Sequence, residues 1–392
     1  MAGVCNPEEY VPAEVFEKVK AASASVATPA LFMSVPLVES AYQELCSGFP
    51  YARVFYAVKA NPARQILEAL ARLGSCFDVA SVYELDEVLS LPGVDGTRVS
   101  YGNTIKKARD VRYAYGKGVR MFASDSEADL RNIAKAAPGS RIYVRIITDG
   151  SESADWPLSR KFGCHPDMAM DLLILSRELG LEPYGISFHV GSQQRDIATW
   201  DATIAKVKVI FERLREEDGI RLKMINMGGG LPANYVSRTN SLDTYTAEIT
   251  RFLKEDFPEN DDFPEIIIEP GRSLVANAGV IVSEVVLVSR KSRFAIDRWV
   301  YTDVGLFNGL IECLDEAIKF PLWTPREAEE EEVVLAGPTC DSMDILYENF
   351  RYRLPLNLCA GDKLFFLSTG AYTASYASVC FNGFPPIETH FV

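Results

Sequence analysis

Eight apolar segments of strand length recur between residues 50 and 275, and most are separated by a segment with the apolar spacing of an amphipathic helix. The first unit is typical: residues 53–58 are β-branched, aromatic or small, and Ile66, Leu70 and Leu73 then fall on one helical face. Eight such units predict a (β/α)8 barrel, whereas a doubly wound open sheet, the alternative, does not favour the number eight. The expected strands are residues 53–58, 76–81, 98–103, 119–124, 141–148, 184–192, 223–230 and 264–272.

The rhythm changes after residue 275, where strand-like segments follow one another with turn residues and little helix between them. This pattern predicts a separate β domain, and the strand-like residues 28–35 are expected to complete it from the N-terminal side. The expected organisation is therefore a segment 1–36 that joins the β domain, a barrel over 37–275 and a C-terminal β domain over 276–392. The acidic run 327–332 is expected to be a solvated loop.

Composition excludes several classes of partner. The chain has 392 residues and a formal net charge of −14, which disfavours nucleic acid and anionic membranes as partners. The longest apolar runs have strand length, so no transmembrane span is expected, and the first residues lack the pattern of a signal peptide. Eight scattered cysteines without a CxxC pair, and only three histidines, predict free thiols in the cytoplasm and no metal site.

Polar residues stand at the ends of most of the expected barrel strands, which is the end where barrel enzymes carry their active sites. Each is ordinary alone: a lysine at a strand end usually reaches water along its own stem, and a triple glycine is often a turn. Packing does not explain why all of them converge on one rim. They are Lys59, Asp78, Ser81, Arg145, His189, Ser192, Gly228–Gly230 and Glu269–Arg272.

This set has a chemical logic. Glycine loops after the seventh and eighth strands match the usual phosphate position of such barrels, and Ser192 and Arg272 add a hydroxyl and a positive charge. A lysine, a carboxylate and a phosphate cradle together suggest pyridoxal 5'-phosphate (PLP). In that interpretation Lys59 forms a Schiff base with the aldehyde, a carboxylate keeps the pyridine nitrogen protonated, and the imidazole of His189 stacks on the ring.

Seven motifs occur in one order along the chain: YAVKANP, FDVAS.YEL, SFHVGS, GGG.P, EPGR, GPTCDS.D and GAYT…FNGF. In these motifs the sequence resembles the alanine-racemase-like, fold-type III PLP-dependent decarboxylases of ornithine, diaminopimelate and arginine, above all the compact bacterial ornithine decarboxylases. The resemblance runs from about residue 28 to the end.

The resemblance implies a role for each matching residue. Lys59 is expected to link to the cofactor, Glu269 to pair with the pyridine nitrogen, and His189 to stack on the ring. The residues expected to orient and charge-balance the cofactor are Asp78, Glu84 and Arg145. Those expected to hold the phosphate are Ser192, Gly229, Gly230, Gly271, Arg272 and Tyr372.

The resemblance also implies a homodimer with shared sites. Cys340 and Asp341 are expected to reach the neighbouring subunit's site, where the thiol returns a proton after CO2 leaves and the aspartate binds the terminal ammonium. Asp315, on a short helix, is expected as a second acidic residue near the far end of the substrate, although Glu312 and Glu316 beside it also fit an ordinary solvated helix. Leu306 and Leu314 stand where the family usually has a tyrosine and another aromatic residue, and this leaves the preferred chain length open.

The function expected from these residues is decarboxylation of a basic L-amino acid, foremost L-ornithine to putrescine and CO2, in polyamine biosynthesis. A lysine, dual lysine/ornithine or other basic amino-acid decarboxylase is the alternative, because one methylene changes binding by only ~1–3 kcal/mol. A racemase is disfavoured, since GPTCDS offers a cysteine where a tyrosine would serve as the second base. A non-catalytic regulatory homologue is a further alternative, though such proteins typically lose the cofactor residues that this chain keeps.

Overall fold

The computed structural model describes residues 2–150, 153–157, 161–258, 263–380, 382 and 384–392, and its described chain divides into two compact units. The barrel unit comprises Glu39–Pro232 and Asn240–Gly271. The β unit comprises Met1–Val38, Ala233–Thr239 and Arg272–Val392. These limits lie close to the expected boundaries at 36/37 and 275/276, but the segment Ala233–Thr239 was not expected to pack with the β unit.

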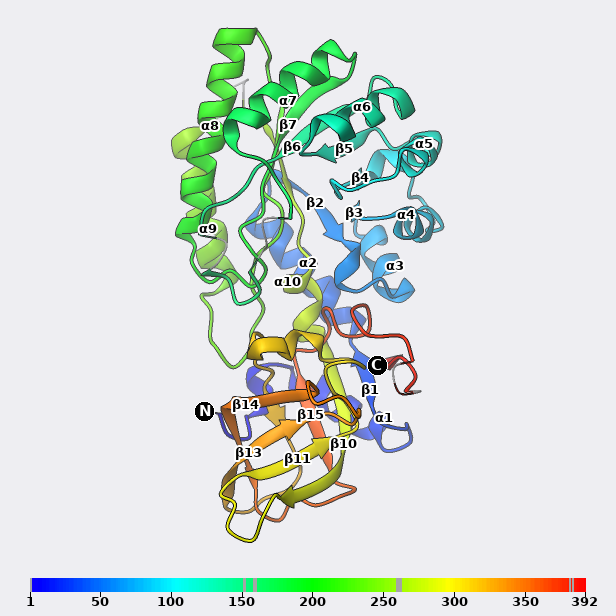
Figure 1. Ribbon diagram of the computed structural model, residues 1–392, viewed down its shortest axis with the longest axis vertical. Helices are drawn as coiled ribbons and strands as arrows, with labels where there is room; N and C mark the ends of the chain where they lie inside the picture. The colour runs from blue at the N-terminus through cyan, green and yellow to red at the C-terminus, as the bar shows by residue number, and fades with distance from the viewer. Residues whose placement is uncertain (1, 151–152, 158–160, 259–262, 381, 383) are drawn as a thin grey trace. The chain divides into compact units, whose positions relative to one another are not determined.

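Eight parallel strands close into a barrel, which confirms the predicted fold class (Figure 1). Closure is made by β2, which pairs with β3 on one side, Ala57 opposite Asp78, and with β9 on the other, Val54 opposite Ile268. The strands are β2 (Ala52–Ala57), β3 (Cys76–Val79), β4 (Val99–Tyr101), β5 (Met121–Ser124), β6 (Arg141–Arg145), β7 (Glu182–Ser187), β8 (Met224–Asn226) and β9 (Glu265–Ile268).

Helices cover the outside of the barrel because each has one apolar face (Figure 1). In α3, Ile66 and Leu70 are fully buried, whereas Arg64 and Glu68 pair with each other on the exposed side. Inside the barrel, Phe55, Tyr143 and Met224 belong to one packed cluster. The helices of this unit are α2 (Val35–Gly48), α3 (Arg64–Arg72), α4 (Val82–Leu89), α5 (Ala108–Gly116), α6 (Glu127–Ala136), α7 (Pro166–Glu178), α8 (Ala198–Asp218) and α9 (Leu242–Asp256). The first residues of α2, up to Val38, belong to the β unit.

The β unit is built on an eight-stranded sheet in which the neighbours run β12-β15-β10-β11-β13-β14. The N-terminal strand β1 pairs antiparallel with β10, Phe32 opposite Val280, which confirms that the N-terminal segment completes the β domain. The strands are β1 (Ala30–Met33), β10 (Gly279–Arg290), β11 (Arg298–Thr302), β12 (Leu322–Trp323), β13 (Glu330–Ala336), β14 (Ile345–Pro355), β15 (Lys363–Leu367) and β16 (Glu388–Phe391). Its helices are α1 (Ala13–Ser23) and the short α10 (Arg272–Val275).

The acidic run is only partly a loop. Strand β13 begins at Glu330, so the expectation of a solvated loop over 327–332 is wrong for its second half. There Glu331 pairs with Arg290 of β10, which gives this part of the run a partner on a neighbouring strand.

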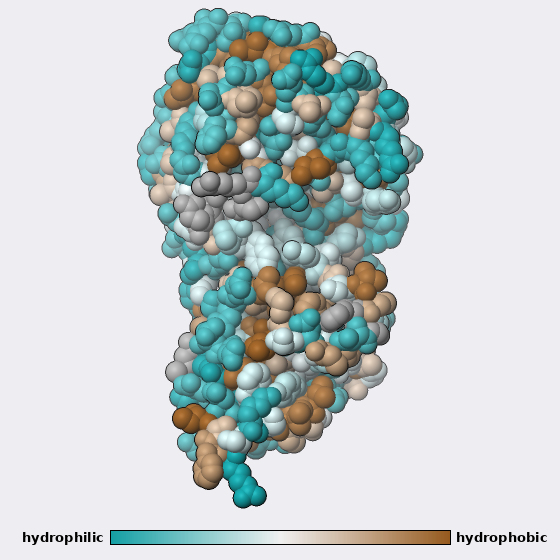
Figure 2. All heavy atoms as spheres, in the orientation of Figure 1, coloured by the Kyte–Doolittle hydropathy of each residue, from teal (hydrophilic) through white to brown (hydrophobic). Residues whose placement is uncertain are grey.

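Polar and apolar side chains alternate in small groups on the face of the molecule shown in Figure 2. Among the described residues, no helix combines the length and the apolar character needed to cross a membrane.

Candidate active site

Lys59 lies directly after the first barrel strand. Strand β2 ends at Ala57, one residue earlier than the sequence pattern predicted, and Lys59 sits in the single 3-10 turn Val58–Ala60. Its side chain is half exposed, and its Nζ is 3.5 Å from Oδ2 of Asp78, the third residue of β3. The amine is therefore accessible from outside and has a carboxylate beside it.

Asp78 is a buried carboxylate, with 4% of its surface exposed. Burial raises the pKa of Asp78 well above its ordinary value, and the charge of Glu269 adds to this rise while Lys59 opposes it. Its Oδ1 is buried and has no hydrogen-bond partner among the described residues. A Cβ at Gly102 would lie 2.0 Å from this Oδ1, so a larger residue there would require the carboxylate of Asp78 to move.

Glu269 follows β9 and is held by a residue that the sequence analysis did not single out. Asn226, the last residue of β8, donates from Nδ2 to Oε1 of Glu269 at 2.5 Å. Its Oδ1 accepts from the backbone N–H of Gly228 at 2.9 Å, and the N–H of Glu269 donates to the carbonyl of Gly228 at 2.7 Å. A polar residue inside the otherwise apolar segment 224–227 is the signal that could have identified Asn226.

His189 is neutral at physiological pH. Burial lowers the pKa of its imidazole well below the ordinary value, and the nearby charges of Arg145 and Lys59 lower it further. Its Nδ1 accepts a hydrogen bond from the N–H of Gly191 at 3.0 Å, which assigns the ring proton to Nε2. The ring is thus flat, uncharged and fixed in one tautomer.

Arg145 and Glu84 are two further charged groups at this end of the barrel. Burial lowers the pKa of Arg145, against the opposing charges of Glu269 and Asp78, and its guanidinium carbon lies 5.1 Å from the ring centre of Phe162. Burial raises the pKa of Glu84, although its Oε2 accepts the N–H of Ala80 at 2.6 Å.

Ser81, which the sequence placed on this rim, has a local role instead. Its hydroxyl caps α4 by accepting the N–H of Glu84 at 3.3 Å.

The glycine loop after β8 has no room for side chains. A Cβ at Gly229 would lie 2.8 Å from the carbonyl oxygen of Glu269 and 3.2 Å from Nε2 of His189. Gly230 has a φ of +112°, which other residues rarely adopt. Ser192 forms a backbone bridge with Trp156, at 3.1 Å in both directions, and Gly271 is buried directly after Pro270.

In the β unit, Arg272 is the centre of a buried cluster. Its guanidinium donates to both carboxylate oxygens of Glu312, at 2.6 and 2.7 Å, and to the hydroxyl of Tyr235 at 2.9 Å. The guanidinium carbon also lies 5.0 Å from the ring centre of Tyr372. Burial works against the charged form, but Glu312 more than offsets it and the pKa of Arg272 is raised well above its ordinary value.

Three further predicted site residues of the β unit have exposed side chains. Cys340 donates its backbone N–H to Oδ1 of Asn382 at 2.9 Å, and the carboxylate of Asp341 accepts the N–H of Met343 at 2.9 Å. Asp315 lies in η6 (Ile311–Glu316), a short 3-10 element. The interpretation of this element as a solvated helix is wrong for Glu312, which is 2% exposed and paired with Arg272.

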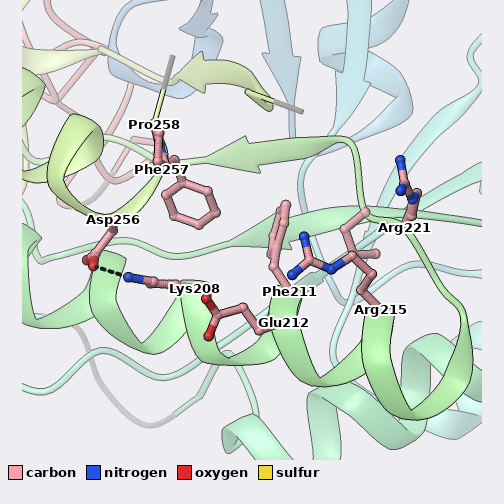
Figure 3. A pocket seen from close by; sticks show the side chains of 9 residues that line it. Lys208, Phe211, Glu212, Arg215, Arg221, Asp256, Phe257 and Pro258 are labelled. Carbon is pink, nitrogen blue, oxygen red and sulfur yellow. Dashed lines mark hydrogen bonds and ion pairs between the residues drawn. The ribbon is translucent and has the colours of Figure 1, made fainter. Parts of the chain in front are cut away.

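A pocket elsewhere on the barrel unit contains none of the predicted site residues (Figure 3). Its lining comes from α8, the end of α9 and the segments that lead into β8 and β9, so it lies toward the amino ends of these strands. Lys208 and Asp256 pair across it at 3.2 Å. In the described part of the chain, no group of three His, Cys, Asp or Glu residues could hold a metal ion.

Comparison with known proteins gives this site a family. Residues 36–276 match the pyridoxal-dependent decarboxylase family through its pyridoxal-binding domain. The chain belongs to this family. A Selenomonas ruminantium lysine/ornithine decarboxylase is 33% identical over 369 residues, covering 94% of this chain and 90% of that protein. Mouse ornithine decarboxylase and Xenopus laevis antizyme inhibitor 2 are each 33% identical, over 88% of this chain and 76% of theirs.

Solved structures agree with this family. The SrLDC complex with PLP and cadaverine is 32% identical and has a TM-score of 0.86 over 96% of this chain and 93% of its own. The Paramecium bursaria Chlorella virus arginine decarboxylase bound to agmatine is 27% identical, with a TM-score of 0.87 over 96% of this chain and 100% of its own.

The residues of the barrel unit fit PLP, the cofactor of this family. Asp78 carries a buried acceptor without a partner among the described residues, and Gly229 lies in a loop that a Cβ would fill. A neutral imidazole, an accessible lysine and a carboxylate fixed by Asn226 lie among the same strand ends. These are the chemical groups that an aromatic, phosphate-bearing aldehyde requires.

Proposed function

We propose that this protein removes the α-carboxylate from a basic L-amino acid, with L-ornithine as the preferred substrate and putrescine and CO2 as products. The observation that carries the proposal is the accessible amine of Lys59 at 3.5 Å from the buried carboxylate of Asp78. A lysine in this position can bind an aldehyde, and few structural roles require a half-exposed amine beside a buried carboxylate whose other oxygen, Oδ1, has no hydrogen-bond partner among the described residues.

Bound PLP would supply the electron sink for the pair of electrons left behind when CO2 departs. Lys59 would bind the cofactor, and Glu269, oriented by Asn226, would keep a proton on the pyridine nitrogen. The neutral ring of His189 offers a flat face without competing for that proton. The groups proposed to hold the phosphate are Ser192, Gly229, Gly230, Gly271, Arg272 and Tyr372.

We further propose that the active form is a homodimer in which Cys340 and Asp341 act in the partner's site. Their side chains are exposed in the single chain, as residues that complete another subunit's site must be. The thiol of Cys340 would deliver a proton to the carbon that has lost CO2. We propose the cytoplasm as its location, because all eight cysteines are free thiols.

The preference for a basic substrate rests on Asp315 and Asp341, whose carboxylates would bind the terminal ammonium and disfavour a second carboxylate. The relatives include proteins named as ornithine, lysine/ornithine and arginine decarboxylases, so the chain length of the substrate is the open part of the proposal. Leu306 and Leu314 leave more space than aromatic residues would.

A competition assay tests this preference. Purified protein with PLP is given equimolar L-ornithine, L-lysine and L-arginine. The amine products are separated and quantified, and their total is compared with the amount of CO2 released. We expect putrescine to predominate. Predominant cadaverine or agmatine would overturn the ornithine preference, while leaving decarboxylation of a basic amino acid in place.

The second candidate function is that of a regulatory protein without activity. It is suggested by antizyme inhibitor 2, which is as similar to this chain as mouse ornithine decarboxylase is. The presence of Lys59, Asp78, His189 and Glu269 at one rim argues against this candidate. Release of CO2 from any of the three amino acids, lost in Lys59→Ala, excludes this candidate. Absence of both cofactor absorbance and CO2 release would support it.

A further inference from the structure

The loop that carries Asp315 has an unusual backbone. Leu314 is extended, with ψ of 133°, and the next two residues, Asp315 and Glu316, both have a φ of +54°. Neither is a glycine. Two successive left-handed residues other than glycine are strained, and such conformations persist only where the surroundings stabilise them.

The side chain of Glu316 stabilises this backbone conformation. Its Oε1 accepts the backbone N–H groups of Glu348 and Asn349, at 2.7 and 2.6 Å, and its Oε2 accepts that of Phe350 at 2.8 Å. Three hydrogen bonds to one carboxylate are charge-assisted and therefore among the stronger ones in proteins. The carbonyl of Glu316 also accepts a hydrogen bond from Nζ of Lys319 at 2.5 Å.

Strand β14 is shaped to receive this carboxylate. In its pairing with β13, Val333 lies opposite Tyr352, but Leu335 already lies opposite Tyr347. One residue of β13 therefore faces a four-residue bulge, 348–351, whose first three N–H groups turn to Glu316. Bulges that redirect a chain are common beside functional sites.

The other end of η6 is anchored as well. Glu312 forms the buried two-point ion pair with Arg272, so η6 is fixed by one carboxylate at each end. Asp315 lies between these anchors, and its own side chain is exposed. The backbone position of Asp315 is thus set by a loop that is anchored on both sides.

We infer that Glu316 is a positioning residue for substrate selection. Its hydrogen bonds to the β14 bulge fix the loop so that Asp315 can bind the terminal ammonium of the substrate. This inference rests on the proposed role of Asp315 in binding a basic substrate. A glutamine at position 316 keeps the shape but replaces one acceptor by an NH2 group that repels the N–H donors, and the strained loop should then relax.

The test measures binding rather than turnover. Putrescine and n-butylamine differ only in the terminal ammonium, and the binding of each to PLP-loaded protein is followed by the change in cofactor absorbance. For Glu316→Gln we expect putrescine affinity to fall roughly tenfold and n-butylamine affinity to change less than about twofold. Glu348→Gln, the control, removes the same charge from an exposed side chain and keeps its backbone N–H, so both affinities should stay within about twofold.

A double-mutant cycle shows whether Glu316 acts through Asp315. If it does, Asp315→Asn together with Glu316→Gln should weaken putrescine binding about as much as Asp315→Asn alone. Additive losses would overturn the inference, as would equal losses in Glu316→Gln and Glu348→Gln. If Glu316→Gln does not fold, Glu316→Asp withdraws the carboxylate by one methylene and is expected to give the same selective loss.

The outcomes also separate this inference from the proposed function. If Asp315→Asn leaves putrescine affinity unchanged, the proposed substrate contact is wrong and the inference fails with it. If Asp315→Asn weakens putrescine but Glu316→Gln does not, the contact stands and only the role of Glu316 is overturned.

Discussion

Asp78 is an acidic residue whose surroundings disfavour the negative charge of its carboxylate. Burial and the charge of Glu269 raise the pKa of this carboxyl by more than Lys59 lowers it. A group whose folded-state pKa is raised favours folding at pH values below its unfolded pKa of about 3.9 and loses that contribution as pH rises through the folded value. The contribution of Asp78 to stability therefore falls as the pH rises, which is typical of a residue kept for function.

Asp78→Asn should stabilise the cofactor-depleted protein at pH 7.5 by roughly 1 kcal/mol, the usual size of a single-substitution effect. The gain should shrink as the pH falls toward 4, because both variants are then uncharged. Thermal unfolding across this pH range measures it, with Asp171→Asn on the exposed face of α7 as the control. A variant that is less stable at pH 7.5 would show that the pair with Lys59 outweighs burial.

Sequence reasoning located the titratable residues of the rim but not the residues that set their geometry. Lys59, His189 and Glu269 lie at the ends of strands, and the end of an apolar run in the sequence shows where a strand ends. Asn226 and Glu312 act through partners distant in sequence, Glu269 and Arg272, so no local pattern identifies them. Glu312 also looks solvated in sequence, since an acidic neighbour three or four residues away is typical of exposed helices.

At the scale of elements, the barrel strands were predictable because both faces of each are buried and each reads as a short apolar run. In the β unit, β14 has no regular strand pattern in the sequence, because charged residues interrupt its apolar ones and its bulge breaks the period of two. Strands β12 and β16 have only two and four residues, too few for a periodic pattern. In the loop after β8, Gly229 is constrained by close contacts and Gly230 by its backbone conformation.

Gly229→Ala should weaken PLP binding at least roughly tenfold, because its Cβ would press on the backbone of Glu269 and on the ring of His189. Titration of the cofactor-depleted protein with PLP, followed by absorbance, gives the affinity. Gly116→Ala is the matched control, since a Cβ there meets nothing within 4 Å. Equal affinity in Gly229→Ala and the unchanged protein would mean that this loop does not approach the cofactor.

At the scale of the whole molecule, the proposed sharing of sites explains why the substrate residues of the β unit are exposed. Lys59 belongs to the barrel unit, whereas Cys340 and Asp341 belong to the β unit and follow β13. In a two-fold symmetric dimer, each subunit would give its barrel to one site and its loop to the other.

Subunit mixing tests this arrangement. Lys59→Ala and Cys340→Ala are each expected to be severely impaired, yet a randomly mixed heterodimer would hold one site with both defects and one with neither. Half of the dimers would be mixed, so about a quarter of the unsubstituted activity should return. Subunit exchange must first be shown, for example with differently tagged chains. With exchange shown, no recovery would mean that each site is built from one chain.

If the carboxyl end of the barrel is a PLP site built around Lys59, reduction with borohydride should link the cofactor to this lysine. Reduction of the PLP-loaded protein fixes the cofactor to the lysine that binds it, and peptide mass mapping then identifies that lysine. We expect one pyridoxyl group per chain, on the peptide that contains Lys59, and none in Lys59→Ala. A label on any other lysine, or an unlabelled protein that still releases CO2, would contradict the account.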